Sequence, residues 1–189
     1  SWSPDGTSIV YTSTDTLFRT PEIRRIDFAA RTVQRMPTPF GLSVADPHLV
    51  GNRLVFPSKD SEADALWIMN VNGTQAQRIT NPLKRGFLYT GPNGDFDPKL
   101  SPDGRRVAFM RIASFEPWRI ITLELATGAE TALTRPGEVE GLPDWSPDGK
   151  RLLHVRYDPA NPAVSSLWTM TADGQGRQRI ALPEGRLYG

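Results

Sequence analysis

The sequence predicts an all-β fold built from four repeats of about 45 residues, and three observations support this prediction. The letters Ser-Pro-Asp-Gly occur three times, at residues 3–6, 101–104 and 146–149. Each copy precedes a short apolar run typical of a strand, at residues 9–11, 107–109 and 152–154. The last two copies start 45 residues apart and the first two start 98 residues apart, about twice that period. A fixed period of this length is the signature of a repeat architecture.

The missing copy lies where this spacing places it. Residues 46–56 match residues 97–109, with Val50, Gly51 and Asn52 in place of the Ser-Pro-Asp-Gly turn. Both segments consist of turn formers, because proline presets φ, Asp or Asn bonds the local backbone and Gly accepts a positive φ. A tight turn between two β-rich runs indicates a hairpin.

Each repeat also contains a second hairpin. Residues 66–73 and 167–174 share Leu-Trp-x-Met and end in Asn-Gly or Asp-Gly, and residues 121–128 take this place in the third repeat. In the first repeat the segment is residues 24–31, with Arg31 where the turn glycine is expected. A short closing strand follows each, at residues 32–36, 77–80, 131–134 and 178–181. Four antiparallel strands in about 45 residues make a β-propeller blade. We therefore expect a single β-propeller segment over residues 1–189, with blades at about 1–40, 41–81, 95–135 and 141–183 and an inserted loop at 81–96.

The whole chain resembles the TolB-like β-propellers with WD40-like repeats. Their pattern is x-Pro-x-Trp-Ser-Pro-Asp-Gly, an apolar strand, Leu-Trp-x-Met-x-x-Asp-Gly and a Leu-Thr ending, and residues 142–149 and 167–174 fit it almost letter for letter. Such repeats commonly form rings of six or more blades, so the resemblance favours an arc of a larger propeller over a closed ring of four. An arc leaves two apolar sheet faces exposed, which predicts self-association through these blade faces.

Composition excludes several classes of protein. With 22 Lys and Arg against 21 Asp and Glu, the net charge of +1 gives no field that would attract nucleic acid. No apolar stretch approaches 18 residues, so no membrane insertion is expected. The chain opens at Ser1 inside a repeat, without an initiator Met, which suggests a fragment or a processed segment. The resemblance implies a periplasmic or extracellular protein, and a chain without cysteine is equally compatible with the cytoplasm.

The sequence favours a non-enzyme. The string nearest to a Gly-x-Ser-x-Gly nucleophile motif is residues 41–45, which lacks the second glycine. The histidines are His48 and His154, and neither has the spacing of a metal site. His154 takes the place of Phe109 on an apolar strand. We therefore expect its imidazole to be packed in the core or to lie at the edge of the core. No catalytic residue and no cofactor are predicted.

Two acids and one histidine are candidate binding residues. Asp46 and Asp97 each precede the proline of an innermost strand, and the resemblance places them near the mouth of the central channel. His48 occupies the position of Lys99 and Asp144 on the same strands. A basic partner segment is one expectation for this region. A cation at Asp46 and Asp97 is a weaker one, because hard cations require more oxygen ligands. Alternatively, each Asp only fixes its local turn.

Departures from the repeat are further candidates for partner binding. The insertion at 81–96 carries Lys84, Arg85, Phe87 and Tyr89, a mixture typical of protein contact surfaces. Alternatively, its aromatic side chains pack over the propeller edge. Trp2 matches Trp145 and Trp67 matches Trp168, which predicts packing between blades. Trp118 breaks this pattern in a connection between strands, so we expect an exposed contact.

Two functions remain after this reading. The first is a non-catalytic scaffold that binds a protein or peptide in the bacterial cell envelope. The alternative is the propeller part of a prolyl-oligopeptidase-type serine peptidase, whose hydrolase domain is absent from these 189 residues. A Gly-x-Ser-x-Gly motif in sequence following residue 189 would distinguish the second from the first.

Overall fold

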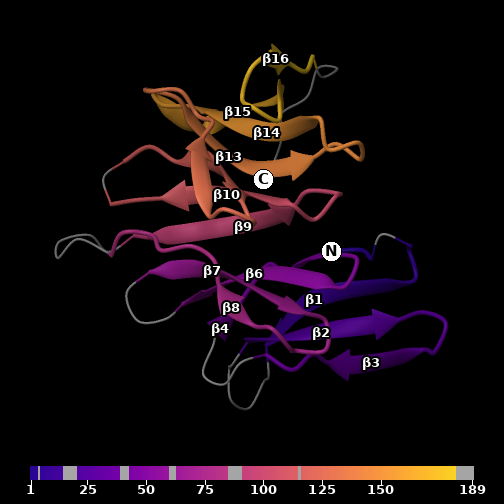
Figure 1. Cartoon of the computed structure of the whole chain (residues 1–189). Coiled ribbons are helices and arrows are strands. Elements are labelled where there is room, and N and C mark those ends of the chain that lie inside the picture. Colours follow the sequence, from indigo (N-terminus) through magenta and orange to yellow (C-terminus); the bar gives the residue numbers. More distant parts are fainter. Residues whose placement is uncertain are drawn as a thin grey trace.

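The computed structural model describes residues 1–3, 5–14, 21–38, 43–59, 63–84, 91–114 and 116–181. All regular structure in this part of the chain is β. The strands form four antiparallel units, named blades 1 to 4, which stack in chain order (Figure 1). The predicted all-β propeller architecture is therefore confirmed. None of the described residues forms a helix long and apolar enough to cross a membrane.

The strands fall into the blades as follows. Blade 1 contains β1 (Ser8–Thr14), β2 (Pro21–Asp27) and β3 (Thr32–Arg35). Blade 2 contains β4 (Ser43–Val44), β5 (His48–Val50), β6 (Arg53–Lys59), β7 (Asp64–Asn70) and β8 (Gln77–Arg78). Blade 3 contains β9 (Gly94–Leu100), β10 (Arg106–Ile112), β11 (Arg119–Glu124) and β12 (Ala129–Ala132). Blade 4 contains β13 (Val139–Trp145), β14 (Arg151–Asp158), β15 (Asn161–Thr171) and β16 (Gln178–Arg179).

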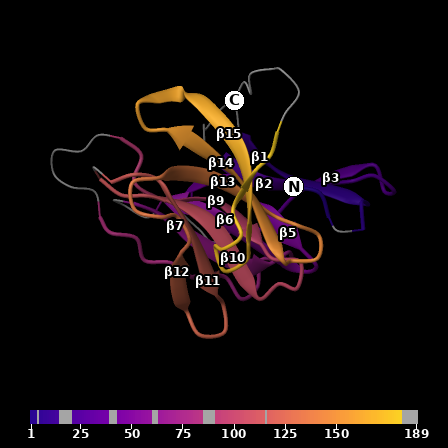
Figure 2. The ribbon, with the colours of Figure 1, turned by 90° about the horizontal axis from the view of Figure 1, so that it is seen from above.

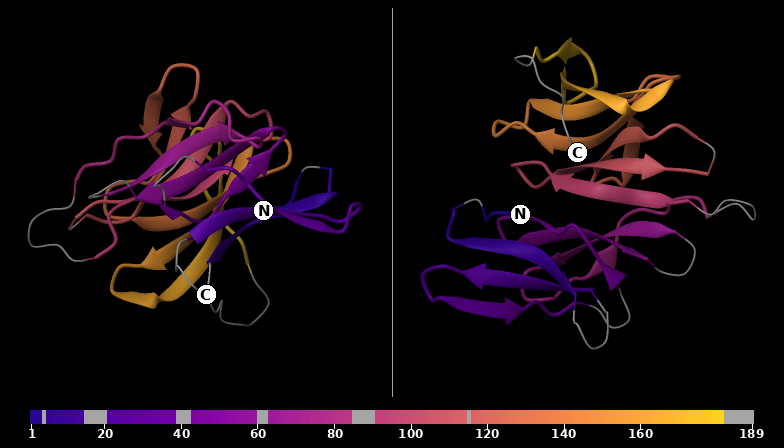
Figure 3. Two further views of the ribbon diagram at one scale, coloured as in Figure 1. Left: turned by 90° about the horizontal axis from the view of Figure 1, so that it is seen from below. Right: turned by 180° about the vertical axis from the view of Figure 1, so that it is seen from behind.

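Neighbouring strands within every blade pair antiparallel. In blade 1 a single antiparallel bridge between Trp2 and Ile9 stands at the position of the first strand. Seen from above, β3 and β12, the last strands of blades 1 and 3, lie away from the centre in different directions (Figure 2). The view from behind shows the same order of blades (Figure 3, right).

Blades 2 and 3 join in one nine-stranded sheet through a parallel bridge between Asp64 and Gly94. Gly94 has a φ of 134°, and a Cβ at this position would lie 2.2 Å from the carbonyl oxygen of Asp64. The backbone of Asp64 also donates to the carbonyl of Asn93 at 3.0 Å. Glycine is required here because two backbones approach too closely for any side chain.

The Ser-Pro-Asp-Gly turns share one hydrogen-bond pattern. In each, the Ser Oγ donates to the Asp Oδ1 at 2.6 Å, and the Asp Oδ1 accepts from the backbone N–H two residues later at 3.0 Å. The glycine of each turn has a φ of 68°. The hydrogen bond from the serine is the main cause that lowers the pKa of Asp5, Asp103 and Asp148. These aspartates stabilise the turns, as their recurrence predicts.

The hydrophobic core consists of three clusters, one between each pair of successive blades. Successive side chains of a strand point to opposite faces. Leu54 and Phe56 of β6 therefore pack in the cluster shared with blade 1, while Val55 packs in the cluster shared with blade 3. The same alternation places Phe109 against blade 2 and Ala108 against blade 4. Most of the core therefore lies between blades rather than within one.

Candidate functional site

The first strands of blades 2, 3 and 4 present one equivalent position with unusual backbone geometry. Asp46, Asp97 and Leu142 have φ angles of 37°, 49° and 53°, in the left-handed region. Each precedes a proline, which has no N–H for the ladder, and bulges interrupt the pairing of β9 and β13 here. Asp tolerates this conformation better than Leu, because its short polar side chain bonds locally. We call these three residues the first-strand rim.

Two carboxylates of this rim influence one another. Burial raises the pKa of Asp97, the charge of Asp46 raises it further, and the ammonium of Lys99 opposes both. Asp97 also contributes, after burial, to a raised pKa of the Tyr157 phenol on β14. Asp46 itself is exposed. The structure thus brings the two predicted acids into electrostatic contact, whereas the blade 4 equivalent is the half-exposed side chain of Leu142.

His48 lies between blades 2 and 3. Its Nδ1 accepts a hydrogen bond from the backbone N–H of Leu100 at 3.1 Å. Burial, with smaller contributions from the charges of Lys99 and the N-terminus, lowers the pKa of His48 to about 4. The imidazole is therefore neutral at pH 7, and its remaining proton is on Nε2. The contact with Leu100 tethers two blades, and any partner would meet an uncharged donor.

A groove lies beside the insertion and Trp118. It has a volume of about 400 Å³ and is lined by segments 81–83, 111–113 and 116–117, with Arg119, Ile121, Glu130 and Ala132. The side-chain amide of Asn93 links the insertion to the loop that follows β10. It donates to the carbonyl of Leu83 at 2.8 Å and accepts from Ser114 Oγ at 3.2 Å. The insertion and the loop before Trp118 therefore border one surface.

The predicted contact residues around this groove are only partly described. Lys84 is exposed, whereas Arg85, Phe87 and Tyr89 lie outside the described residues. Trp118 is 36 % exposed and contacts Tyr157 edge to face, with ring centroids 5.3 Å apart. Its carbonyl accepts from the N–H of Glu140 at 3.1 Å, which fixes the loop against blade 4. The binding role of these residues stays a prediction.

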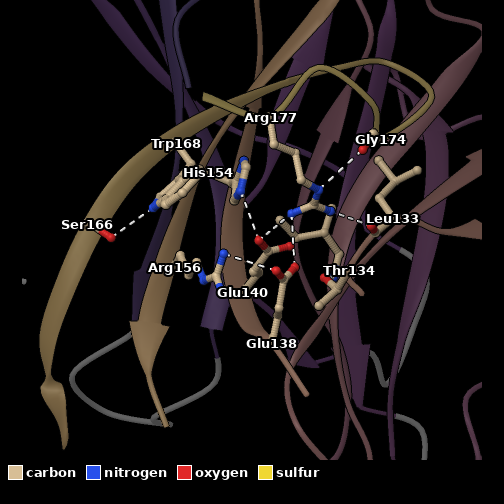
Figure 4. Close-up of polar contacts among 11 residues, drawn as sticks. Leu133, Thr134, Glu138, Glu140, His154, Arg156, Ser166, Trp168, Gly174 and Arg177 are labelled. Atoms are coloured by element: carbon tan, nitrogen blue, oxygen red, sulfur yellow. Dashed lines mark hydrogen bonds and ion pairs between the residues drawn. The ribbon is translucent and has the colours of Figure 1, made fainter. Parts of the chain in front are cut away.

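A buried ionic network between blades 3 and 4 has no counterpart in the sequence-based expectations (Figure 4). His154 and Glu140 are both 0 % exposed, and His154 Nε2 lies 3.2 Å from Glu140 Oε1. Arg177 Nη1 lies 2.5 Å from the same oxygen and 3.3 Å from Glu138 Oε2. Arg156 pairs with Glu138 at 3.0 Å.

The network fixes blade 4 to blade 3. Arg177 Nη2 donates to the carbonyl of Leu133 at 2.5 Å, so the guanidinium bridges both blades. Burial acts to raise the pKa of Glu140, but the hydrogen bonds and charges of His154 and Arg177 outweigh it and hold the pKa below its usual value. Two acids face two arginines here, so the charges of these four side chains balance, while Glu140 Oε2 and His154 Nδ1 are buried without a hydrogen-bond partner. We assign it a structural role.

The four tryptophans other than Trp118 differ in how they pack. Trp67 is partly buried and packs against the cluster between blades 1 and 2, and Trp168 is partly buried beneath Arg156, 5.2 Å from the guanidinium carbon to the ring centroid. Trp145 donates from Nε1 to the carbonyl of Lys99 at 2.9 Å. Trp2, expected to pack between blades, is instead 60 % exposed, because no blade lies against that face of blade 1 in the structure.

No metal centre is evident in the described part of the chain. No group of three or more His, Cys, Asp or Glu side chains lies together there in a way that could hold an ion. Asp46 and Asp97 therefore provide two carboxylates to any cation, fewer than hard cations generally require.

Repeated antiparallel blades with shared inter-blade cores are typical of a β-propeller. The chain belongs to the TolB β-propeller family, since the family described as "TolB beta propeller domain" matches residues 1–188. The crystal structure of TolB from Acinetobacter baumannii is 22 % identical, with a TM-score of 0.74 over 98 % of this chain and 43 % of that chain.

Two other proteins extend the comparison. An uncharacterized protein of Agrobacterium fabrum is 27 % identical over 174 residues, which are 84 % of this chain and 54 % of the relative. A puromycin-hydrolyzing peptidase of Mycobacterium tuberculosis is 15 % identical, with a TM-score of 0.67 over 96 % of this chain and 28 % of the peptidase. The chain thus spans about half the length of the relatives that it matches.

Proposed function

We propose that this propeller is a non-catalytic scaffold of the bacterial cell envelope that binds a protein or peptide, and that the first-strand rim receives a basic segment of that partner. The observation that carries the proposal is the electrostatic contact between Asp46 and Asp97, at one equivalent position of neighbouring blades. The likeness to TolB supports an envelope location.

The charge at the rim favours a cationic partner. Two carboxylates near one another repel, and Lys99 offsets the repulsion only in part. A lysine or arginine of a partner would neutralise this charge, and such complementarity gives specificity and faster association. Leu142, 47 % exposed at the third rim position, adds an apolar contact. The rim therefore fits a basic residue with an apolar neighbour.

The groove beside Trp118 supplies a second contact region in this proposal. Its charged side chains are already paired, since Arg111 binds Glu130 and Arg119 binds Glu116. Leu83 and Trp118 are both large hydrophobic residues that are exposed. We expect this region to add apolar contacts beside the insertion rather than to select charge.

Affinity capture from an envelope extract tests the proposal. The parent chain is compared with an Asp46→Asn/Asp97→Asn variant, which removes both charges and little volume. Asp158→Asn is the matched control, because Asp158 is exposed at the end of β14 and its Oδ1 accepts from Ala160 N, which an amide oxygen also permits. We expect a specific protein to be retained by the parent and the control and lost by the double variant. Equal retention by all three would exclude the rim as the binding site.

A second candidate function is the propeller part of a serine peptidase, which the likeness to the Mycobacterium tuberculosis peptidase favours. In that case a Gly-x-Ser-x-Gly motif would follow residue 189 in the complete gene, with Asp and His downstream. The isolated chain is expected to hydrolyse no peptide or ester under either function. Turnover by the purified chain that survives repeated chromatography would contradict both.

A further inference from the structure

Buried polar atoms without a hydrogen-bond partner gather between blades 1 and 2. The described residues hold seven such side-chain atoms, and five of them lie on strands of these two blades. The five are Ser8 Oγ, Thr12 Oγ1, Arg25 Nε, Ser58 Oγ and Trp67 Nε1. Most buried polar groups in proteins are hydrogen-bonded, so a set of exceptions in one place requires an explanation.

On blade 1, three of these residues face blade 2. Ser8 and Thr12 each lie two residues from Val10 on β1. Arg25 is paired with Val10 across β1 and β2. Residues two apart on a strand, and residues directly paired across strands, share one face of a sheet. Because Val10 belongs to the core cluster between blades 1 and 2, the arginine and both hydroxyls face blade 2.

On blade 2, Ser58 and Trp67 face blade 1 for the same reason. Ser58 lies two residues after Phe56 on β6, and Trp67 is paired with Phe56 across β6 and β7. Phe56 belongs to the same core cluster as the blade 1 residues, and Trp67 packs against that cluster. The unpartnered atoms therefore come from two sheet faces that pack on each other.

The repeat places Arg25 near Trp67 across this interface. At the next interface the equivalent residues, identified by their strand pairing, are Ile68 of β7 and Ile121 of β11. Both isoleucines pack in the single cluster between blades 2 and 3. Blade 1 thus carries a cationic side chain at a position that holds a core isoleucine in blade 2.

This arrangement leaves donors without an acceptor. Arg25 Nε and Trp67 Nε1 donate hydrogen bonds and cannot accept them, whereas a hydroxyl can also donate. Among the residues that the structure describes, no ion pair includes Arg25. Asp27 lies two residues along the same face of β2, and its Oδ1 accepts from the backbone N–H of Ala30 at 2.8 Å. The interface therefore offers a positive charge and several unused donors.

We infer that a small oxyanion of the phosphate or carboxylate type binds between blades 1 and 2, with Arg25 and Trp67 as its donors. The guanidinium supplies the charge and a planar set of N–H groups that fits either oxyanion. Hydroxyls of Thr12 and Ser58 are available to its remaining oxygens. Arg25 and Trp67 are both only half-buried, so a small anion can approach them from solvent. The site is separate from the first-strand rim, because its residues lie on other strands.

An NMR titration of the ¹⁵N-labelled chain tests this inference. Sodium phosphate and sodium acetate are added in separate experiments at constant ionic strength, with sodium chloride as the reference salt. The indole N–H signal of Trp67 is identified by its absence from the spectrum of Trp67→Phe. We expect this signal to shift saturably with phosphate, with acetate or with both, and to stay in place with chloride. The anion that binds more tightly distinguishes a tetrahedral from a planar ligand.

Arg25→Met removes the guanidinium and keeps much of the side-chain volume, so the oxyanion should bind at least about tenfold more weakly. Arg35→Met is the matched control, because Arg35 is an exposed arginine of the same blade that pairs with Glu22 at 2.8 Å. It should bind the oxyanion like the parent. If thermal unfolding shows that Arg25→Met does not fold, Arg25→Lys replaces it, with the same expected loss, because lysine keeps the charge but lacks the Nε donor.

Three results would overturn the inference. The first is a Trp67 indole signal that moves with neither oxyanion, which would leave water as the acceptor. The second is an equal shift with chloride, which would indicate a general effect of salt. The third is unchanged binding by the Arg25 variant, or an equal loss in Arg35→Met.

Discussion

Arg111 forms a bidentate ion pair with Asp95, with Nε 2.6 Å from Oδ1 and Nη2 2.9 Å from Oδ2. Asp95 is 0 % exposed, and burial acts to raise its pKa while Arg111 and Thr80 oppose this rise. Thr80 belongs to blade 2 and Arg111 to blade 3, so the carboxylate joins two blades. The ion pair is therefore part of the inter-blade contact rather than a surface feature.

Removal of the guanidinium should destabilise the fold strongly. Arg111→Met leaves the Asp95 carboxylate buried without a cation, and we expect a loss of about 3–5 kcal/mol in the free energy of unfolding, measured with urea. Arg119→Met is the control, because Arg119 pairs with Glu116 at an exposed site and should cost less than about 1 kcal/mol. Equal losses in the two variants would show that Asp95 does not depend on Arg111.

The bridge between blades 2 and 3 makes Gly94 intolerant of substitution. A Cβ would lie 2.2 Å from the carbonyl oxygen of Asp64 and 2.5 Å from its nitrogen, so Gly94→Ala must displace backbone. We expect a loss of roughly 2–4 kcal/mol in thermal and urea unfolding. Gly104 also has a positive φ, of 68°, but a Cβ there would have no heavy atom within 4 Å. Gly104→Ala should therefore cost only about 1 kcal/mol in the free energy of unfolding. The bridge would be misplaced if Gly104→Ala proved the more harmful change.

The turn aspartates predict a loss of stability in acid. The pKa of Asp5 is lowered to about 2, and hydrogen bonds from serine also lower the pKa of Asp103 and Asp148. A carboxyl whose pKa is lower in the folded than in the unfolded state stabilises the fold above pH 4, and this contribution disappears as the pH falls toward 2. Asp103→Asn/Asp148→Asn keeps an acceptor oxygen but does not titrate. Its urea midpoint should fall less than that of the parent between pH 4 and pH 2, and a parallel fall would contradict this assignment.

Arg31 occupies a turn position that favours glycine. Its φ is 53°, while the equivalent Gly73, Gly128 and Gly174 have φ angles of 81°, 71° and 83°. Because the left-handed conformation strains a residue with a Cβ, Arg31→Gly should stabilise the protein by about 0.5–1 kcal/mol. Differential scanning calorimetry would measure this as a higher melting temperature. A lower melting temperature would mean that the arginine side chain contributes more than its backbone costs.

Repetition explains which parts of the fold were predictable. The Ser-Pro-Asp-Gly turns and the apolar strand residues recur in the sequence, so their spacing predicts a repeated all-β fold. Trp2 was expected to be buried because Trp145 is its equivalent, yet it is exposed, since burial of this position depends on a preceding blade that is not in the structure. Local sequence cannot report whether a neighbouring sheet is present.

The network around Glu140 was missed for a related reason. Arg177 lies in the hairpin between β15 and β16, and only the packing of blade 4 on blade 3 brings it to Glu140 and to the carbonyl of Leu133. In blades 2 and 3 the positions equivalent to His154 hold phenylalanine, at Phe56 and Phe109. One signal was available: His154 replaces Phe109 at a core position, and a buried imidazole requires a polar partner.

The first-strand rim was predicted by position but not in its detail. Asp46 and Asp97 do influence one another, as expected for neighbouring first strands, whereas His48 is engaged with the backbone of Leu100. The hydrogen bond to His48 could not be predicted from sequence, because it depends on how closely two blades approach.

Binding of a basic peptide at the rim tests the central claim most directly. Fluorescence anisotropy would compare a labelled peptide rich in lysine, arginine and leucine with an acidic peptide of the same length, using the parent, Asp46→Asn/Asp97→Asn and Asp158→Asn. We predict saturable binding of the basic peptide by the parent and by Asp158→Asn, at least about tenfold weaker binding by the double variant and weaker binding at high salt. Binding of both peptides with equal affinity, or unchanged binding by the double variant, would contradict the claim.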